Sequence, residues 1–239
     1  MPETPSRASI ATWDPGQRHL VLMLALTFTT GIVDAVGYLG LDRVFTANMT
    51  GNVVILGMAI AGGDGLPILG PTLALAGFLA GAAIGGRVLR TAPPAWSNRT
   101  SGTFMATGVL ATALGVAAVI APPHAGEAWA LVVTALLAIA MGLQAATARR
   151  LAVKDVTTVV VTSTLTGLAA DSRLAGGDGS NWARRALAVA LILVGAGVGA
   201  LLLRAGGQRG VGVGMLVAGV LAIAVSALGH RHRDERRDA

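Results

Sequence analysis

Long apolar segments separated by short polar turns are the feature that most constrains how this chain can fold. Glycine-rich and Pro-Pro junctions, such as those at 62–65 and 93–94, interrupt the apolar residues. About 20 apolar residues in a helix cross the roughly 30 Å hydrocarbon core of a bilayer. The pattern therefore predicts an all-α polytopic membrane protein. The segments cover residues 20–40, 44–61, 68–89, 103–121, 128–148, 156–170, 183–203 and 210–229.

The composition argues against several functional classes. Of 239 residues, 54% are apolar and only 13% charged, too few to cover a water-soluble globule. Cysteine is absent and the four histidines lie outside or at the edges of the apolar segments, so we expect no metal and no cofactor. No serine has a base in reach and no acids pair inside the membrane, so we expect no enzyme.

The distribution of charge predicts the partners. The net charge of +6 lies between the segments and at the ends, not along one soluble face, so we expect no nucleic-acid partner. The expected partners are membrane lipid and an unknown small solute or ion, and the oligomeric state is left open. Abundant Ala, Gly and Arg beside a single lysine, Lys154, are typical of a GC-rich bacterial genome. We therefore expect a multi-pass protein of the bacterial cytoplasmic membrane.

One transmembrane domain is predicted for residues 20–229, after a cytoplasmic segment at 1–19 and before a basic cytoplasmic tail at 230–239. Arg7 and Arg18 precede the first apolar run as they would in a signal peptide. The run is too long for that interpretation and lacks a convincing small-x-small cleavage site. We expect it to remain as the first transmembrane helix.

The segments pair across the chain, first with fifth, second with sixth, third with seventh and fourth with eighth, at offsets of about 107 to 116 residues. The clearest local match is T-x-x-x-T-G at 46–51 and again at 162–167. This spacing predicts an internal repeat with halves at about 20–121 and 128–229.

The positive charges predict the topology, because cytoplasmic flanks carry the excess of Lys and Arg. If all eight segments cross the membrane, the 18 basic residues divide equally between the two sides. If the second and sixth segments enter and leave on one side, all except Arg43, Arg204 and Arg209 lie inside, with both termini cytoplasmic. The sequence thus predicts six spanning helices plus two short or broken membrane-embedded segments. Three crossings per half make this an inverted 3+3 internal repeat.

Polar residues in the second segment predict a site for a substrate or ion. Thr46, Asn48, Thr50 and Asn52 cluster around Gly51, which permits unusual backbone angles and close approach of a neighbour. Because unpaired backbone groups are costly in hydrocarbon, we interpret the segment as a broken helix whose polar groups line a site. The alternative is that these side chains only bond helix to helix.

The same hypothesis extends to other polar residues. Thr162, Thr166 and Gly167 form the counterpart in the sixth segment. Asp34 is the acid that lies well inside a spanning run, where a carboxylate costs on the order of 3 kcal/mol unless it is paired, protonated or hydrated. A role linked to a proton or cation is one hypothesis; a structural hydrogen bond to Asn48 or Asn52, or hydration at the outer interface, is the other. Gln144 stands one position out of register in the second half, as a site-lining or helix-bonding residue.

Other residues predict packing and anchoring. Gly77, Gly81 and Gly85 on the third segment, and Gly195 with Gly199 on the seventh, have the G-x-x-x-G spacing of closely packed membrane helices. The tryptophans precede apolar segments, as interfacial anchors do. They are Trp13, Trp96, Trp129 and Trp182.

Two stretches carry a resemblance to a known family. GIVDAVGYLGLDRVFTANMTGNVVILG at 31–57 and GLQAATARRLAVKDVTTVVVTSTLTGLAADS at 142–172 are similar to the YoaK-like family of bacterial membrane proteins, a domain of unknown function. The resemblance implies membrane class and supplies no substrate. Ala145 and Leu168 stand where many relatives have Asn, so the second half has fewer amides than the family pattern. That pattern falls on Asp34, Asn48, Thr50, Gly51, Asn52, Gln144, Arg149, Thr166 and Gly167.

The functional prediction is a small secondary transporter or permease of unknown substrate, with proton or cation coupling as a further hypothesis. The alternative is a structural or signalling membrane protein without a transport cycle, because a broken helix can be architectural.

Overall fold

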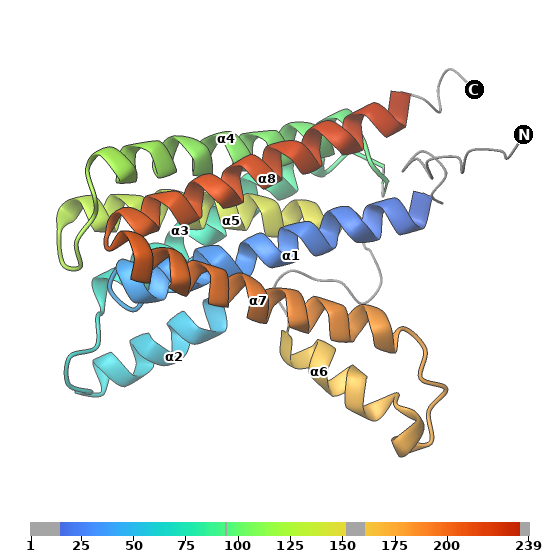
Figure 1. Ribbon diagram of the computed structural model, residues 1–239, viewed down its shortest axis with the longest axis horizontal. Helices are drawn as coiled ribbons and strands as arrows, with labels where there is room; N and C mark the ends of the chain where they lie inside the picture. Colours follow the sequence, from blue (N-terminus) through green and yellow to red (C-terminus); the bar gives the residue numbers. More distant parts are fainter. Residues whose placement is uncertain (1–14, 94, 152–160, 235–239) are drawn as a thin grey trace, which may run out of the picture.

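The computed structural model describes residues 15–93, 95–151 and 161–234. Within these ranges the chain forms helices joined by turns and loops, and no strand (Figure 1). Two shorter apolar helices, α2 (Met49–Ile60) and α6 (Val161–Ala170), accompany the long ones, and a 3-10 turn follows α6 at Arg173–Ala175. Among the described residues, six helices are long and apolar enough to cross a membrane, which agrees with the prediction of an all-α protein and gives six candidate spanning helices. These are α1 (Pro15–Gly40), α3 (Leu69–Leu89), α4 (Asn98–Ile120), α5 (Ala128–Leu151), α7 (Trp182–Gly206) and α8 (Arg209–Asp234).

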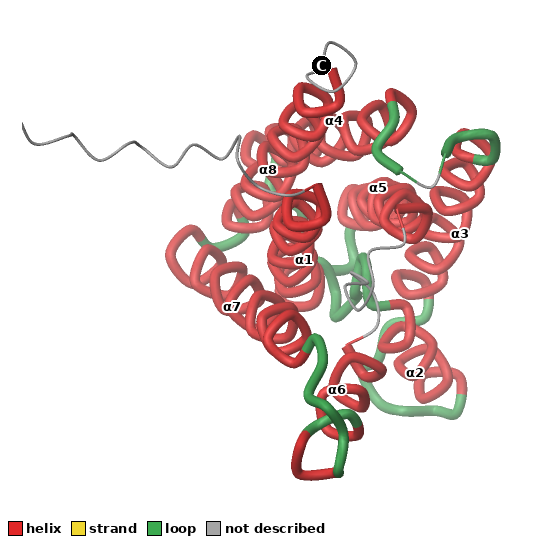
Figure 2. The backbone as a smooth tube through the Cα atoms, turned by 90° about the vertical axis from the view of Figure 1, so that its right-hand side faces the viewer, coloured by secondary structure: helices red, strands yellow, loops and turns green. Residues whose placement is uncertain are grey.

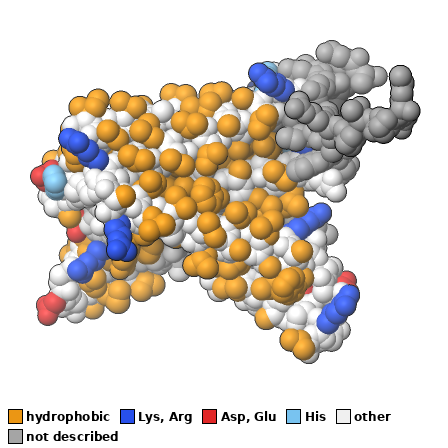
Figure 3. All heavy atoms as spheres, in the orientation of Figure 1, with side chains coloured by type: hydrophobic (Ala, Val, Ile, Leu, Met, Phe, Trp, Pro, Cys, Tyr) orange, Lys and Arg blue, Asp and Glu red, His pale blue; other side chains and the backbone are white. Residues whose placement is uncertain are grey.

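The long helices run side by side in one bundle, and α1 begins at the end of the bundle at which α8 finishes (Figures 1 and 2). On the face drawn in Figure 3, apolar side chains cover the middle of the bundle and charged side chains gather toward its two ends. The two short helices lie on one side of the bundle. Each begins near the middle of its length, and they run toward opposite ends (Figure 1).

Glycines set the distance between neighbouring long helices. A Cβ atom on Gly81 of α3 would lie 2.0 Å from the carbonyl oxygen of Ile139 on α5, and one on Gly195 of α7 would lie 2.2 Å from that of Phe28 on α1. Only glycine permits such close contact between backbones. Lipid tails are as apolar as leucine, so membrane helices associate through packing of this kind. The predicted packing role of these glycines is confirmed.

Helices α4 and α8 meet through four glycines in a reciprocal pattern. A Cβ on Gly108 would lie 2.8 Å from the Gly219 carbonyl oxygen, and one on Gly219 would lie 2.8 Å from that of Gly108. Gly115 and Gly212 face each other in the same way, at 2.8 and 2.7 Å. The two helices therefore cross about a local two-fold axis.

Trp96 is buried, so its prediction as an interfacial anchor was wrong. Its ring stacks on His19 with a centroid separation of 5.5 Å, and its Nε1 donates to the Ser101 hydroxyl at 2.8 Å. The ring fits because Gly229 of α8 has no side chain: a Cβ there would lie 1.9 Å from the indole. Trp182, by contrast, is exposed, and Trp13 lies outside the described residues.

Candidate functional site

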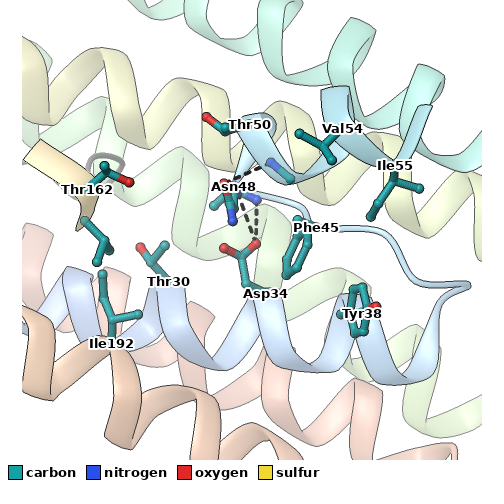
Figure 4. A pocket seen from close by; sticks show the side chains of 13 residues that line it. Thr30, Asp34, Tyr38, Phe45, Asn48, Thr50, Val54, Ile55, Thr162 and Ile192 are labelled. Carbon is teal, nitrogen blue, oxygen red and sulfur yellow. Dashed lines mark hydrogen bonds between the residues drawn. The ribbon is translucent and has the colours of Figure 1, made fainter. Parts of the chain in front are cut away.

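A cavity of about 730 Å³ lies where α1, the loop at 41–48, α2, α6 and α7 meet (Figure 4). Its volume is in the range of pockets that hold small molecules, roughly 300 to 1,000 Å³. The wall combines polar side chains with aromatic and aliphatic ones. The lining residues are Thr30, Asp34, Tyr38, Phe45, Ala47, Asn48, Thr50, Gly51, Val54, Ile55, Val161, Thr162 and Ile192.

Asp34 holds the loop that leads into α2. Its Oδ1 accepts hydrogen bonds from the backbone N–H groups of Thr46 at 3.0 Å, Ala47 at 2.8 Å and Asn48 at 3.3 Å. A carboxylate oxygen is a strong acceptor for converging N–H donors. Asp34 thus makes structural hydrogen bonds, as one hypothesis expected. Its partners are backbone N–H groups of the loop and not the side chains of Asn48 or Asn52. Asp34 also lines the cavity, so the structure places it where it could meet a ligand as well.

Asn52 completes the support of the same loop from α2. Its Oδ1 accepts from the Phe45 N–H at 2.9 Å and its Nδ2 donates to the Phe45 carbonyl at 2.6 Å. Thr46 adds a hydroxyl bond to the Val33 carbonyl at 3.4 Å. Both Asn52 and Thr46 are fully buried and neither lines the cavity. Their polar atoms pair the non-helical backbone, which hydrocarbon would otherwise leave unsatisfied.

The interruption in the second predicted segment lies before α2 and not inside it. The chain leaves α1 through Asp42 and Arg43, with φ of 99° and 54°, and becomes helical again only at Met49. Asn48 is the N-cap residue, and its Oδ1 accepts from the Gly51 N–H at 3.3 Å. Side chains of this type are preferred at helix N-caps because they satisfy a free N–H of the first turn.

Gly51 supplies close approach, but not the unusual backbone angle that the sequence suggested. It lies in the first turn of α2 and is not among the described glycines with positive φ. A Cβ on Gly51 would lie 2.6 Å from the Phe45 ring, which in turn stacks on Tyr38 at a centroid separation of 4.9 Å. The glycine therefore makes room for an aromatic pair in the cavity wall.

The counterpart residues in α6 divide between two environments. Thr162 lines the cavity. Thr166 is exposed, donates its hydroxyl to the Thr162 carbonyl at 2.9 Å and is not among the lining residues. Gly167 lies beneath Arg185, whose Nη1 donates to the Gly167 carbonyl at 2.7 Å and pairs with Asp171 at 2.6 Å. The predicted segment at 156–170 is described as helix only from Val161, and 156–160 lie outside the described residues.

Gln144 lies behind the cavity wall. Its side chain is buried, and its Nε2 donates at 3.4 Å to the hydroxyl of Thr30, which does line the cavity. The Thr30 hydroxyl in turn donates to the Leu26 carbonyl at 2.9 Å. Of the two predicted roles for Gln144, bonding helix to helix is the one that this contact matches.

Tyr38 and Phe45 are site residues that the sequence predictions missed. Tyr38 is the single tyrosine of the chain and lies four residues after Asp34, a spacing that places both on one face of a helix. That spacing was the available signal. No sequence signal pointed to Phe45, because its position depends on the loop conformation that Asp34 and Asn52 stabilise.

Comparison with known proteins identifies the family. Residues 22–226 match the family described as Protein of unknown function (DUF1275). The chain belongs to this family. The UPF0700 transmembrane protein YoaK of Bacillus subtilis (strain 168) is 32% identical to this DUF1275 protein over 154 residues, which cover 63% of this chain and 65% of that relative's length.

These matches confirm the resemblance to YoaK-like membrane proteins and support the assignment of this DUF1275 chain to the integral membrane proteins. No solved structure matches the chain. Neither description names an activity or a substrate.

Proposed function

We propose that this DUF1275 protein is a small secondary transporter in which a solute or ion binds in the cavity between α1, α2, α6 and α7. One observation carries the proposal: a short helix from each half of the chain contributes polar side chains to one cavity, Asn48 and Thr50 from α2 and Thr162 from α6. In transporters built from inverted repeats, the substrate site lies where interrupted helices of the two halves meet. We propose no catalytic step and no cofactor.

An inverted 3+3 repeat is part of this proposal, and the helix contacts support it. A Cβ on Gly31 of α1 would lie 2.3 Å from the Ile192 carbonyl oxygen of α7, and one on Gly142 of α5 would lie 2.1 Å from the Phe78 oxygen of α3. In both contacts the next close atom is the backbone nitrogen four residues further on, at 2.9 Å. The contact of α1 with α7 therefore has the same geometry as the contact of α5 with α3. In this comparison α5 takes the place of α1, and α3 takes the place of α7.

A second pair of contacts follows the same exchange. Gly81 approaches Ile139, and Gly195 approaches Phe28. The offset that separates Phe28 from Ile139 is the one that separates Gly31 from Gly142. The local two-fold axis between α4 and α8 fits the same operation. Two halves related in this way, with three long helices each, have opposite orientations in the membrane.

The proposed orientation rests on the distribution of arginines. Arg99 donates to the Val88 carbonyl at 3.2 Å and Arg150 to the Ala92 carbonyl, at the end of the bundle where α1 begins. Arg43 bonds the Gly65 carbonyl at 3.1 Å at the opposite end, where Arg204 and Arg209 join α7 to α8. Because positive charge accumulates on the cytoplasmic side, we propose that α1 begins and α8 ends in the cytoplasm of a bacterial cell. In this arrangement α2 and α6 are embedded without crossing.

A structural or signalling protein is the second candidate. The observation that favours it is the use of Asp34 and Asn52, which both form hydrogen bonds to the backbone of the loop at 41–48. Residues that serve this purpose are needed for the fold whether or not a solute ever enters the cavity.

Two threonines one helical turn apart separate the candidates. Thr162 lines the cavity and Thr166 does not, although both belong to α6. Small cations, anions and neutral solutes are first screened for a rise in the unfolding temperature of the purified protein, because a bound ligand stabilises by mass action. Uptake of any stabilising solute is then measured in proteoliposomes. Transport predicts that Thr162→Ala and Asn48→Ala alter uptake and that Thr166→Ala does not; equal effects of Thr162→Ala and Thr166→Ala, or no uptake of any stabilising solute, would favour the structural candidate.

A further inference from the structure

At the cavity, Asp34 and Asn48 already accept hydrogen bonds from four N–H groups in the loop before α2 and in its first turn. Free N–H groups in the first turn of a helix form an anion site when no other acceptor occupies them. Here the N–H groups of Thr46, Ala47 and Asn48 donate to Asp34, and that of Gly51 donates to the Asn48 side chain. The protein's own carboxylate and amide thus take up four N–H groups that would otherwise be open to an anionic ligand. An anion would also be repelled by Asp34.

Asp34 has acceptor capacity that the loop does not use. The hydrogen bonds to the loop all end on Oδ1. Among the described residues, Oδ2 has no hydrogen-bond partner, and the carboxyl group faces the cavity in Figure 4. A carboxylate oxygen can accept further bonds or contact a positive charge. No Lys, Arg or His is among the described residues that line the cavity.

The wall next to Asp34 is suited to an apolar body. Tyr38 and Phe45 stack with an interplanar angle of 23°, and both line the cavity together with Asp34. Val54 and Ile55 line the cavity on the same side, whereas Ile192 lines it on the other side of Asp34 (Figure 4). Aromatic faces attract cations, and ligands with a quaternary ammonium group are bound in this way. A volume of about 730 Å³ is far larger than a bare inorganic ion needs.

We propose that the solute of this cavity is an organic cation with an apolar or aromatic body, whose positive charge contacts Asp34 Oδ2 and whose body lies against Tyr38 and Phe45. The proposal rests on the transporter function proposed above, because it names the substrate class of the same site. It is separable from that function, since binding of a cation can be measured without transport.

Two probes of the same shape and opposite charge test the substrate class. Tetraphenylphosphonium and tetraphenylborate present the same four rings around a positive or a negative centre. Equilibrium binding of each to the purified full chain in detergent is measured with Thr166→Ala as the control variant, because Thr166 is not among the lining residues. We expect saturable binding of the cation and none of the anion. Saturable binding of tetraphenylborate at equal or higher affinity overturns the proposal.

The Asp34→Asn variant tests the charge while retaining the loop, because an amide oxygen still accepts the loop N–H groups. We expect it to weaken tetraphenylphosphonium binding by about ten-fold or more. Phe45→Leu removes the aromatic face and keeps an apolar side chain, and we expect a loss of about five-fold. If Asp34→Asn does not fold, the comparison of the two probes on the unmodified protein decides alone. Unchanged affinity in a folded Asp34→Asn overturns the assignment.

Flux separates this inference from the proposed function. Saturable tetraphenylphosphonium binding without uptake into proteoliposomes upholds the substrate class and contradicts transport. Uptake of another solute that tetraphenylphosphonium does not inhibit upholds transport and contradicts the organic cation.

Discussion

Asn52 pairs both backbone groups of Phe45: its Nδ2 donates to the Phe45 carbonyl at 2.6 Å, and its Oδ1 accepts from the Phe45 N–H at 2.9 Å. A side chain seven residues away thereby replaces the two bonds that a helix would have given that residue. The contact helps to explain how the loop at 41–48 can be non-helical in a membrane protein, where unpaired backbone groups are costly.

We predict that Asn52→Leu destabilises the protein more than Asn48→Ala does. It leaves two buried backbone groups unpaired, each at a cost of about 1–3 kcal/mol, so a total near 3 kcal/mol is expected. Asn48→Ala removes only a cap, at about 1 kcal/mol, and serves as the matched control. Thermal unfolding in one detergent compares the two. A loss for Asn52→Leu no greater than for Asn48→Ala would mean that the loop does not depend on this pairing.

The second prediction concerns glycines in equivalent contacts of the two halves. Gly81→Ala and Gly195→Ala should each cost about 1–3 kcal/mol or more, because a Cβ would lie 2.0 or 2.2 Å from a facing carbonyl oxygen. The controls are Gly86→Ala on α3 and Gly197→Ala on α7, where nothing lies within 4 Å and alanine favours the helix. Unfolding temperatures of the four variants check this. A large loss for one glycine of the pair and none for the other would contradict the proposed repeat.

The third prediction tests topology, and the absence of cysteine makes it simple, because any introduced thiol is the single one. Asp64 lies in the turn between α2 and α3 and Arg149 in the last turn of α5, and both are exposed. We expect Asp64→Cys in intact cells to react with a membrane-impermeant thiol reagent and Arg149→Cys to react only after lysis. Labelling of position 149 alone would rule out the six-crossing orientation proposed here.

Sequence patterns sufficed for the helices because segment length and apolarity determine whether a helix spans a bilayer. They also marked the polar residues near the helix interruption, but they placed that interruption inside the second segment, whereas it lies before α2. They did not distinguish polar residues that line the cavity from polar residues whose side chains form hydrogen bonds to the protein's own backbone. Asn48 and Asn52 look alike in the sequence, yet Asn48 lines the cavity and Asn52 is buried beside Phe45.

The repeated T-x-x-x-T-G motif shows why the sequence pattern alone does not predict which polar residues line the cavity. In the first half Thr46 lies in the loop, where its N–H donates to Asp34, and helix begins only at Met49. In the second half Thr162 and Thr166 both lie in α6, so the Thr166 hydroxyl bonds the Thr162 carbonyl one turn earlier. The same letters therefore occupy different backbone conformations. Asp34 makes the difference: at the offset that relates Gly31 to Gly142, its counterpart in the second half is Ala145, which has no carboxylate.

The last prediction separates the two roles of Asp34. Asp34→Ala removes the acceptor of three N–H groups, whereas Asp34→Asn keeps an acceptor oxygen and removes only the charge. We expect Asp34→Ala to lower stability by about 3 kcal/mol relative to Asp34→Asn, because buried N–H groups lose their partner. Asp34→Asn should remain monodisperse in detergent but lose any cation- or proton-dependent flux, since the amide neither titrates nor balances a positive charge. The measurements are thermal unfolding and solute-dependent ion flux in proteoliposomes. If Asp34→Asn keeps a demonstrated flux while Asp34→Ala unfolds, the residue serves the loop alone, and the carboxylate has no part in moving a solute.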